Sequence, residues 1–136
     1  MPHLTIDYSS RLADVFDRAA LVRELHPLVR EVAGSAGVCK TFFRPAETYV
    51  GDGGGDGRDF VHAQVGLMPG RSETLKARLS ESVLAVLAKH LPTGGADGVV
   101  LSAEVRDLPG SYRLFPAGRP QADAPVPVPC AASLPR

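Results

Sequence analysis

Two segments with helical spacing, each lying between runs with strand spacing, limit the fold of this chain more than any other feature. Apolar residues in the first segment form one stripe, which consists of Leu21, Leu25, Leu28, Val29 and Val32. The stripe of the second segment consists of Leu75, Leu79, Val83, Val86, Leu87 and His90. Such spacing is typical of helices that bury one face. Each segment therefore predicts a helix packed on a sheet.

Capping residues indicate where both helices begin and end. Asp14 or Asp17 can cap the first helix, which should end at Gly34. Ser72 can cap the second helix, which we expect to be about eighteen residues long. Pro27 lies inside the first helix, where its ring and its missing N–H predict a kink.

Four runs of alternating apolar and polar residues predict strands, at residues 2–8, 37–50, 60–67 and 99–107. Pro45 predicts an edge position or a bulge, because proline cannot donate to a neighbouring strand. The order of elements is therefore β-α-β-β-α-β, and right-handed crossovers place both helices on the same side. We expect an α+β fold, with a four-stranded mixed sheet and two helices on one face.

This pattern ends near residue 107 and divides the chain into two parts. A chain of 136 residues can bury one core, and we expect residues 2–107 to form that domain. Residues 108–136 should form a C-terminal docking segment around Tyr112, Leu114 and Phe115, followed by a Pro-rich tail. The sheet face without helices should carry apolar residues, which predicts self-association.

Charge and hydropathy exclude several classes of function. Fifteen basic residues balance fifteen acidic ones, and no block of like charge predicts a nucleic-acid groove or a membrane surface. Apolar stretches are too short to span a membrane, and no signal peptide is recognisable. We therefore expect a cytoplasmic protein. Cys39 and Cys130 match neither a disulfide framework nor a zinc site, and Cys39 should be a small core residue.

Three residues are candidates for moving a proton. Methionine aminopeptidase removes Met1 before a small residue, so the mature chain should begin at Pro2. A free N-terminal proline is a secondary amine, which acts as a base when it is neutral. Met-Pro starts without a catalytic role are common, however, so Pro2 alone favours an ordinary N-terminus. His3 and His62 can carry protons, although single histidines in strands are more often packed or hydrogen-bonded.

Three cations and one aromatic residue are candidates for binding an anion. Arg71 precedes the cap of the second helix, where the helix dipole and unpaired N–H groups favour a carboxylate. Lys40, Phe42 and Arg44 alternate along the second predicted strand and should point to the same face. For each cation, a solvated position in a turn or on a strand is the alternative.

Taken together, these features resemble the tautomerase superfamily, and within it the 5-carboxymethyl-2-hydroxymuconate isomerase branch. The resemblance rests on the start Pro2-His3-Leu4, the repeated βαβ order and the string FVHAQVGLMPGRS at residues 60–72. It runs over roughly residues 2 to 107. Similar proteins are trimers with a site near a subunit boundary, so the resemblance implies a homotrimer.

The resemblance also implies an activity and a role for each candidate. Pro2 matches the proline that acts as the base without metal or cofactor, and Arg71 matches the arginine that binds a substrate carboxylate. The family's second-strand arginine falls at or near Lys40, which lacks the bidentate fork, so Arg44 is an alternative. Phe42 would be an aromatic wall. The implied protein is a cofactor-independent keto-enol tautomerase or isomerase of an unsaturated 2-hydroxy or 2-oxo carboxylic acid, as in aromatic catabolism.

Such a base needs a lowered pKa. A terminal amine titrates near pH 8 or above, whereas an apolar pocket and nearby cations lower its pKa. Two alternatives stay open, namely a dehalogenase or hydratase using the same site, and a non-catalytic trimeric binding module. Retention of Met1 would favour the binding module, because it blocks the amine of Pro2.

Overall fold

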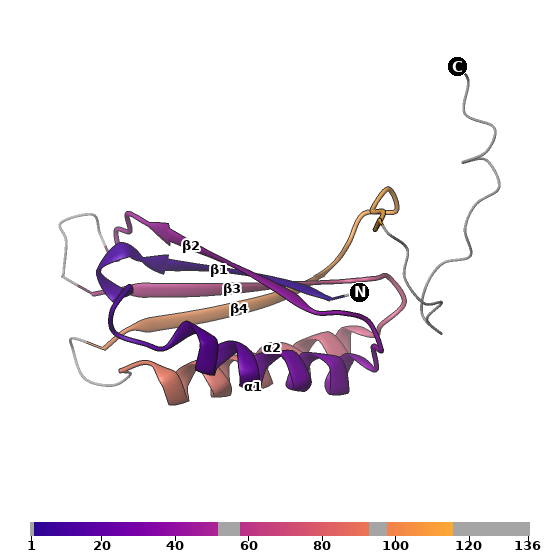
Figure 1. Ribbon diagram of the computed structural model, residues 1–136, viewed down its shortest axis with the longest axis horizontal. Coiled ribbons are helices and arrows are strands. Elements are labelled where there is room, and N and C mark those ends of the chain that lie inside the picture. The colour runs from indigo at the N-terminus through magenta and orange to yellow at the C-terminus, as the bar shows by residue number, and fades with distance from the viewer. Residues whose placement is uncertain (1, 52–57, 93–97, 116–136) are drawn as a thin grey trace, which may run out of the picture.

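The computed structural model describes residues 2–51, 58–92 and 98–115, which form a sheet with two helices on one of its faces (Figure 1). The strands are β1 (His3–Ser9), β2 (Lys40–Ala46), β3 (Phe60–Leu67) and β4 (Val100–Asp107). The helices are α1 (Arg18–Ala33) and α2 (Glu73–His90), and a 3-10 helix, η1 (Ser10–Leu12), follows β1. The predicted fold class and order of elements are confirmed.

The strand order is β2-β1-β3-β4, so each βαβ half contributes one parallel pair to the sheet. The two halves meet through the antiparallel pair β1 and β3. Strand β2 therefore lies at an edge, as Pro45 predicts. It is shorter than predicted because it pairs only with β1, and that pairing runs from His3 opposite Lys40 to Ser9 opposite Ala46.

Both helices begin at capped residues. Asp17 is the N-cap of α1, and its side chain accepts a hydrogen bond from a backbone N–H at 3.1 Å. Ser72 caps α2 in the same way at 3.1 Å, and α2 has the eighteen residues expected. Gly34 ends α1 in the left-handed conformation, with φ of 65°. Helix α1 continues through Pro27 as one element.

The core lies between the sheet and the helices. Its fully buried residues include Leu4, Ile6, Leu21, Leu25, Val29, Val61, Ala63, Val65, Leu79, Val83 and Leu87. Burying one side chain of this size stabilises the fold by about 1.5–3 kcal/mol, so these contacts hold both helices in place. Cys39 packs against this core as predicted, and burial raises the pKa of its thiol to about 11.

The sheet face without helices is mostly polar, so the expectation of an apolar face is wrong. The strand register places Arg44, Asp7, His62 and Ser102 in one row across this face. A second row contains Lys40, His3, Gly66 and Arg106. Because side chains alternate along a strand, the apolar positions of β1 and β3 point to the helices and leave polar ones on the other side.

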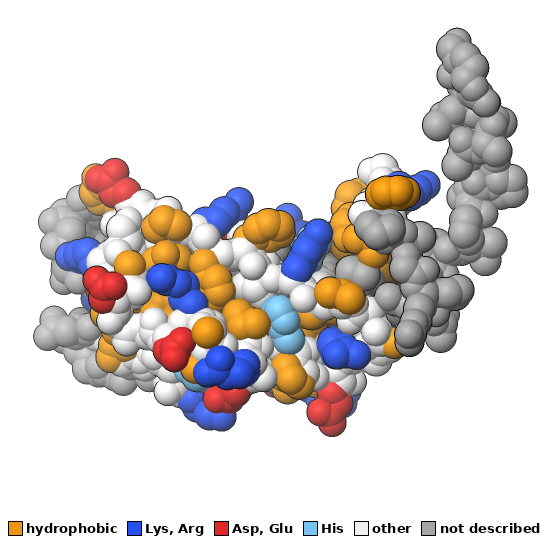
Figure 2. All heavy atoms as spheres, in the orientation of Figure 1, with side chains coloured by type: hydrophobic (Ala, Val, Ile, Leu, Met, Phe, Trp, Pro, Cys, Tyr) orange, Lys and Arg blue, Asp and Glu red, His pale blue; other side chains and the backbone are white. Residues whose placement is uncertain are grey.

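The surface drawn in Figure 2 carries no large region of one charge. Lys and Arg side chains lie apart from one another, with hydrophobic and acidic side chains between them. None of the helices in the described ranges is long and apolar enough to cross a membrane.

The segment after β4 docks on the end of the sheet. The backbone N–H of Leu108 donates to the carbonyl of Leu67 at 2.7 Å, and the Leu108 side chain is buried. The ring of Tyr112 lies edge-on to His3, with 5.7 Å between the centroids. Phe115 is 94% exposed, so Leu108 and Tyr112 make the contacts. The predicted Pro-rich tail, residues 117–136, lies outside the described residues.

Candidate active site

Pro2 lies at the end of the sheet where β1 and β2 begin and where β3 and β4 end (Figure 1). The next residue, His3, pairs with Lys40 on one side and Gly66 on the other. Pro2 itself is fully buried. Burial of this kind generally disfavours the charged form of an amine.

Arg71 connects the end of α1 to the end of β3. Its Nε donates to the carbonyl of Ala33 at 3.0 Å, and its Nη1 donates to the carbonyl of Met68 at 3.2 Å. A cation at the C-terminus of a helix is stabilised by the helix dipole. The side chain is partly buried. Arg71 is therefore held in a defined position at the same end of the sheet as Pro2.

Lys40 adds a second positive charge at this end. Its Nζ lies 5.8 Å from the centroid of the Phe42 ring, which is a cation–π distance. The side chain of Phe42 is 52% exposed. Burial lowers the pKa of His3, and the charge of Lys40 lowers it further. The same charge disfavours protonation of any amine close to His3.

Arg44 lies apart from these residues. It is four positions beyond Lys40 on β2, which corresponds to about 13 Å along a strand. Its Nε and Nη2 donate to the two carboxylate oxygens of Asp7 at 2.7 and 3.0 Å. The structure therefore brings Pro2, Lys40 and Arg71 to one end of the sheet and places Arg44 near the middle of the open face.

Tyr112 is a residue that sequence reasoning did not place in the site. Its hydroxyl and Nδ1 of His3 are both buried, and neither has a hydrogen-bond partner among the described residues. The two side chains come from opposite ends of the described chain. The sequence feature that could have suggested Tyr112 as a site residue is its aromatic hydroxyl just after the last strand, and this feature is weak evidence.

His62, the other candidate proton carrier, lies on the open face away from Pro2. Its Nδ1 is 2.6 Å from the hydroxyl of Ser102, and its Nε2 is 2.9 Å from a carboxylate oxygen of Glu104. Both ring nitrogens therefore have partners. Across residues 2–51, 58–92 and 98–115, no group of three or more His, Cys, Asp or Glu side chains is arranged to hold a metal ion.

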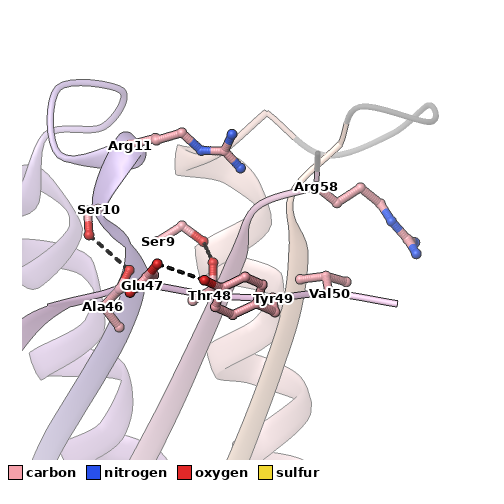
Figure 3. A pocket seen from close by; sticks show the side chains of 9 residues that line it. All are labelled: Ser9, Ser10, Arg11, Ala46, Glu47, Thr48, Tyr49, Val50 and Arg58. Atoms are coloured by element: carbon pink, nitrogen blue, oxygen red, sulfur yellow. Dashed lines mark hydrogen bonds between the residues drawn. The ribbon is translucent and has the colours of Figure 1, made fainter. Parts of the chain in front are cut away.

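A cavity of about 430 Å³ lies at the opposite end of the sheet (Figure 3). Its lining consists of Ser9, Ser10, Arg11, Ala46, Glu47, Thr48, Tyr49, Val50 and Arg58. Several polar groups there bind each other, since the hydroxyls of Ser9 and Thr48 are hydrogen-bonded and Tyr49 donates to Glu47 at 2.8 Å. None of the predicted site residues lines this cavity.

Comparison with known proteins identifies the family. The sequence model of the 5-carboxymethyl-2-hydroxymuconate isomerase family matches residues 2–114. The chain belongs to this family. It is therefore an isomerase, and the resemblance to the tautomerase superfamily is confirmed. The match begins at Pro2 and extends beyond β4, so it includes the segment that carries Leu108 and Tyr112.

Solved structures of isomerases from this family share the fold. A 5-carboxymethyl-2-hydroxymuconate delta-isomerase is 24% identical with a TM-score of 0.63, covering 84% of this chain and 87% of that one. A 5-carboxymethyl-2-hydroxymuconate isomerase from Deinococcus radiodurans R1 is 21% identical with a TM-score of 0.62, covering 83% and 88%.

The similarity extends to the wider superfamily. A fused 4-OT described as a wild-type symmetric trimer is 20% identical with a TM-score of 0.60, covering 79% of this chain and 85% of that one. No curated protein sequence matches this isomerase significantly.

Proposed function

We propose that this isomerase is a cofactor-independent keto-enol tautomerase that uses the amine of Pro2 as general base on an unsaturated 2-hydroxy carboxylic acid. One observation carries the proposal: Pro2, Lys40 and Arg71 meet at one end of the sheet. The family match that begins at Pro2 supports isomerisation over dehalogenation or hydration.

The reaction needs a neutral amine at Pro2. Removal of Met1 frees that amine, and burial together with the charge of Lys40 lowers its pKa towards neutral pH. Pro2 then accepts the proton of the C2 hydroxyl group. The O–H electron pair forms the C2 carbonyl, the C=C bond shifts along the chain, and Pro2 returns the proton to carbon. The proton count and electron count balance without a cofactor.

Two cations hold the carboxylates of the substrate. Arg71 presents a guanidinium that the carbonyls of Ala33 and Met68 keep in place, and this geometry suits a carboxylate. Between the two candidates on β2, we assign the second role to Lys40. Arg44 is already paired with Asp7 and is too far along the strand. Phe42 supplies an aromatic wall beside Lys40.

We also infer a homotrimer in the cytoplasm that serves the catabolism of aromatic compounds. Two solved structures with this fold are described as symmetric trimers, which supports the assembly. The open face of the sheet suits burial against other copies, because several of its charges are paired within one subunit, as in Arg44 with Asp7 and Arg106 with Glu104. Removing water costs less free energy for a charge that keeps an ion-pair partner than for an isolated charge.

The decisive experiment adds one residue ahead of Pro2, which converts the amine to an amide without a lone pair. The extended protein should fold and sediment as a trimer but lose activity by about 10²–10⁴-fold, the range for a missing general base. Activity is measured as the enol-to-ketone absorbance change of phenylenolpyruvate and of 2-hydroxymuconate.

Two controls complete this experiment. Intact mass establishes that the unmodified protein lacks Met1. Pro2→Ala keeps a primary amine at nearly the same position, so it should retain partial activity. Full activity of the extended protein would refute Pro2 as the base.

A further inference from the structure

Two buried polar atoms at the Pro2 end of the sheet belong to side chains whose rings are in contact. They are Nδ1 of His3 and the hydroxyl oxygen of Tyr112, and neither atom has a hydrogen-bond partner among the residues that the structure describes. The two rings are in edge contact, with 5.7 Å between centroids and an angle of 69° between planes. His3 directly follows Pro2, so this pair belongs to the end of the sheet that holds the proposed base.

Close packing holds the pair in place. A Cβ atom on Gly66 would lie 2.8 Å from Nε2 of His3 and 2.7 Å from Cδ2 of Leu108, so a larger residue would require one of these side chains to shift. The hydrogen bond from Leu108 to Leu67 anchors the start of the segment that carries Tyr112. His3 and Leu108 thus pack closely around Gly66, and Tyr112 follows Leu108 by four residues.

Burying these two atoms destabilises the fold unless another molecule forms hydrogen bonds with them. A buried polar atom without a partner destabilises the fold by about 1–3 kcal/mol, so two such atoms in one place need an explanation. Burial and Lys40 lower the pKa of His3, so His3 is neutral at neutral pH. The pair therefore offers hydrogen bonds without adding charge.

We propose that Tyr112 and His3 bind the C2 oxygen of the substrate and so select 2-hydroxy and 2-oxo acids over acids that lack this oxygen. The inference rests on the proposed function, in which Arg71 and Lys40 hold carboxylates and the C2 hydroxyl lies at Pro2. Residues 109–111 form an exposed turn before Tyr112, whose N–H donates to Pro109 at 2.9 Å. The proposal requires this turn to shift, so that the buried hydroxyl faces the substrate.

The chemical role of the pair follows from the charge that develops during the reaction. When the C2 hydroxyl gives its proton to Pro2, negative charge grows on the C2 oxygen until the carbonyl forms. Tyr112 donates a hydrogen bond to this oxygen and keeps its own proton throughout. One donor of this kind accelerates a reaction by about 10²–10³-fold.

Tyr112→Phe tests the inference, because it removes only the hydroxyl. We expect kcat/KM to fall about 10²-fold, mainly through kcat. The thermal midpoint should not fall, since the hydroxyl has no partner within residues 2–51, 58–92 and 98–115. Tyr49→Phe is the matched control, because the Tyr49 hydroxyl binds Glu47 at the opposite end of the sheet, and its activity should not change.

A binding measurement separates this inference from the proposed base. By calorimetry, the unmodified protein should bind 2-oxoadipate more tightly than adipate, and Tyr112→Phe should remove that preference. His3→Phe, which keeps a ring and removes both nitrogens, should reduce it. The protein with an extra residue ahead of Pro2 should keep the preference although it is inactive.

Several results would overturn the inference. They are unchanged kinetics of Tyr112→Phe, a retained preference for 2-oxoadipate in that variant, a lower thermal midpoint, and dissociation of the assembly. The last two would mean that the hydroxyl has a structural partner. Full activity of the extended protein would instead refute Pro2 as base, and the preference for 2-oxoadipate would still decide the role of Tyr112.

Discussion

The two ends of the sheet contain similar polar side chains but differ in what those side chains bind. At the end with the cavity, the chain supplies the partners itself, as in Ser9 with Thr48 and Tyr49 with Glu47. At the Pro2 end, the hydroxyl of Tyr112 and Nδ1 of His3 are buried and have no partner within the described chain. A hollow surface is therefore a poorer guide to chemistry here than polar groups whose partners are missing.

The positive charges show the same difference. Arg11, at the cavity end, forms an ion pair with Asp59 at 2.8 Å. Arg71, at the Pro2 end, donates hydrogen bonds to the backbone carbonyls of Ala33 and Met68, which orient its guanidinium. The two arginines therefore differ in the contacts that hold them, and the proposed function assigns a substrate carboxylate to Arg71 alone.

The largest expected difference between the two ends comes from their arginines. Arg71→Ala should lower kcat/KM for carboxylate substrates by about one to three orders of magnitude, because a charge-assisted contact is lost from the reacting complex. Arg11→Ala should leave the kinetics unchanged, because Arg11 lies at the opposite end of the sheet from Pro2. The variant should also stay folded, since an exposed ion pair contributes at most about 1 kcal/mol to stability. Steady-state kinetics of both variants measure the contrast.

Arg71→Ala also removes the bonds to Ala33 and Met68, so circular dichroism must establish that the variant is folded. A folded Arg71→Ala with unchanged kinetics would limit Arg71 to connecting α1 and β3.

A smaller difference is expected between two cations of β2, and it tests how far the binding site extends along that strand. Lys40→Ala should raise KM for a dicarboxylate by about tenfold, the loss of one charged contact. Arg44→Ala should change KM little, because Arg44 is paired with Asp7. The two variants are matched, since both remove a cation from the same face of one strand. A larger KM effect in Arg44→Ala would move the binding site towards the middle of the sheet.

The smallest expected effect concerns stability in acid. The pKa of His3 is lowered in the folded protein from its ordinary value of 6.5, first by burial and then by Lys40. Below pH 6.5 the unfolded chain therefore binds more protons at this position, and the free energy of unfolding falls as the pH falls towards the folded-state pKa. Urea denaturation at several pH values should show this slope, and His3→Gln should reduce it.

His26, on helix α1, is the control for that measurement, because burial lowers its pKa as well. Its Nε2 lies 2.7 Å from the hydroxyl of Thr41. His26→Gln should remove a separate share of the slope. An unchanged slope in His3→Gln would mean that His3 titrates as in an unfolded chain.

Local signals explain why most of the fold could be predicted. Asp17, Ser72 and Gly34 act within one turn of a helix, so their roles are readable from neighbouring residues. Pro45 predicted an edge strand because its missing N–H excludes a partner on one side. The expectation of an apolar open face was wrong because the apolar residues that alternate along β1 and β3 all point to the helices, which leaves the polar residues on the other side.

By itself, the sequence determined the order of helices and strands, the stripe that each helix buries and the presence of Pro2 at the start of β1. Only the tertiary structure decided that Asp7 pairs with Arg44, 37 positions away, and that His3 contacts Tyr112. The reason is geometric. Periodicity along a segment depends on residues a few positions apart, whereas strand neighbours and docked segments depend on how distant parts of the chain pack together.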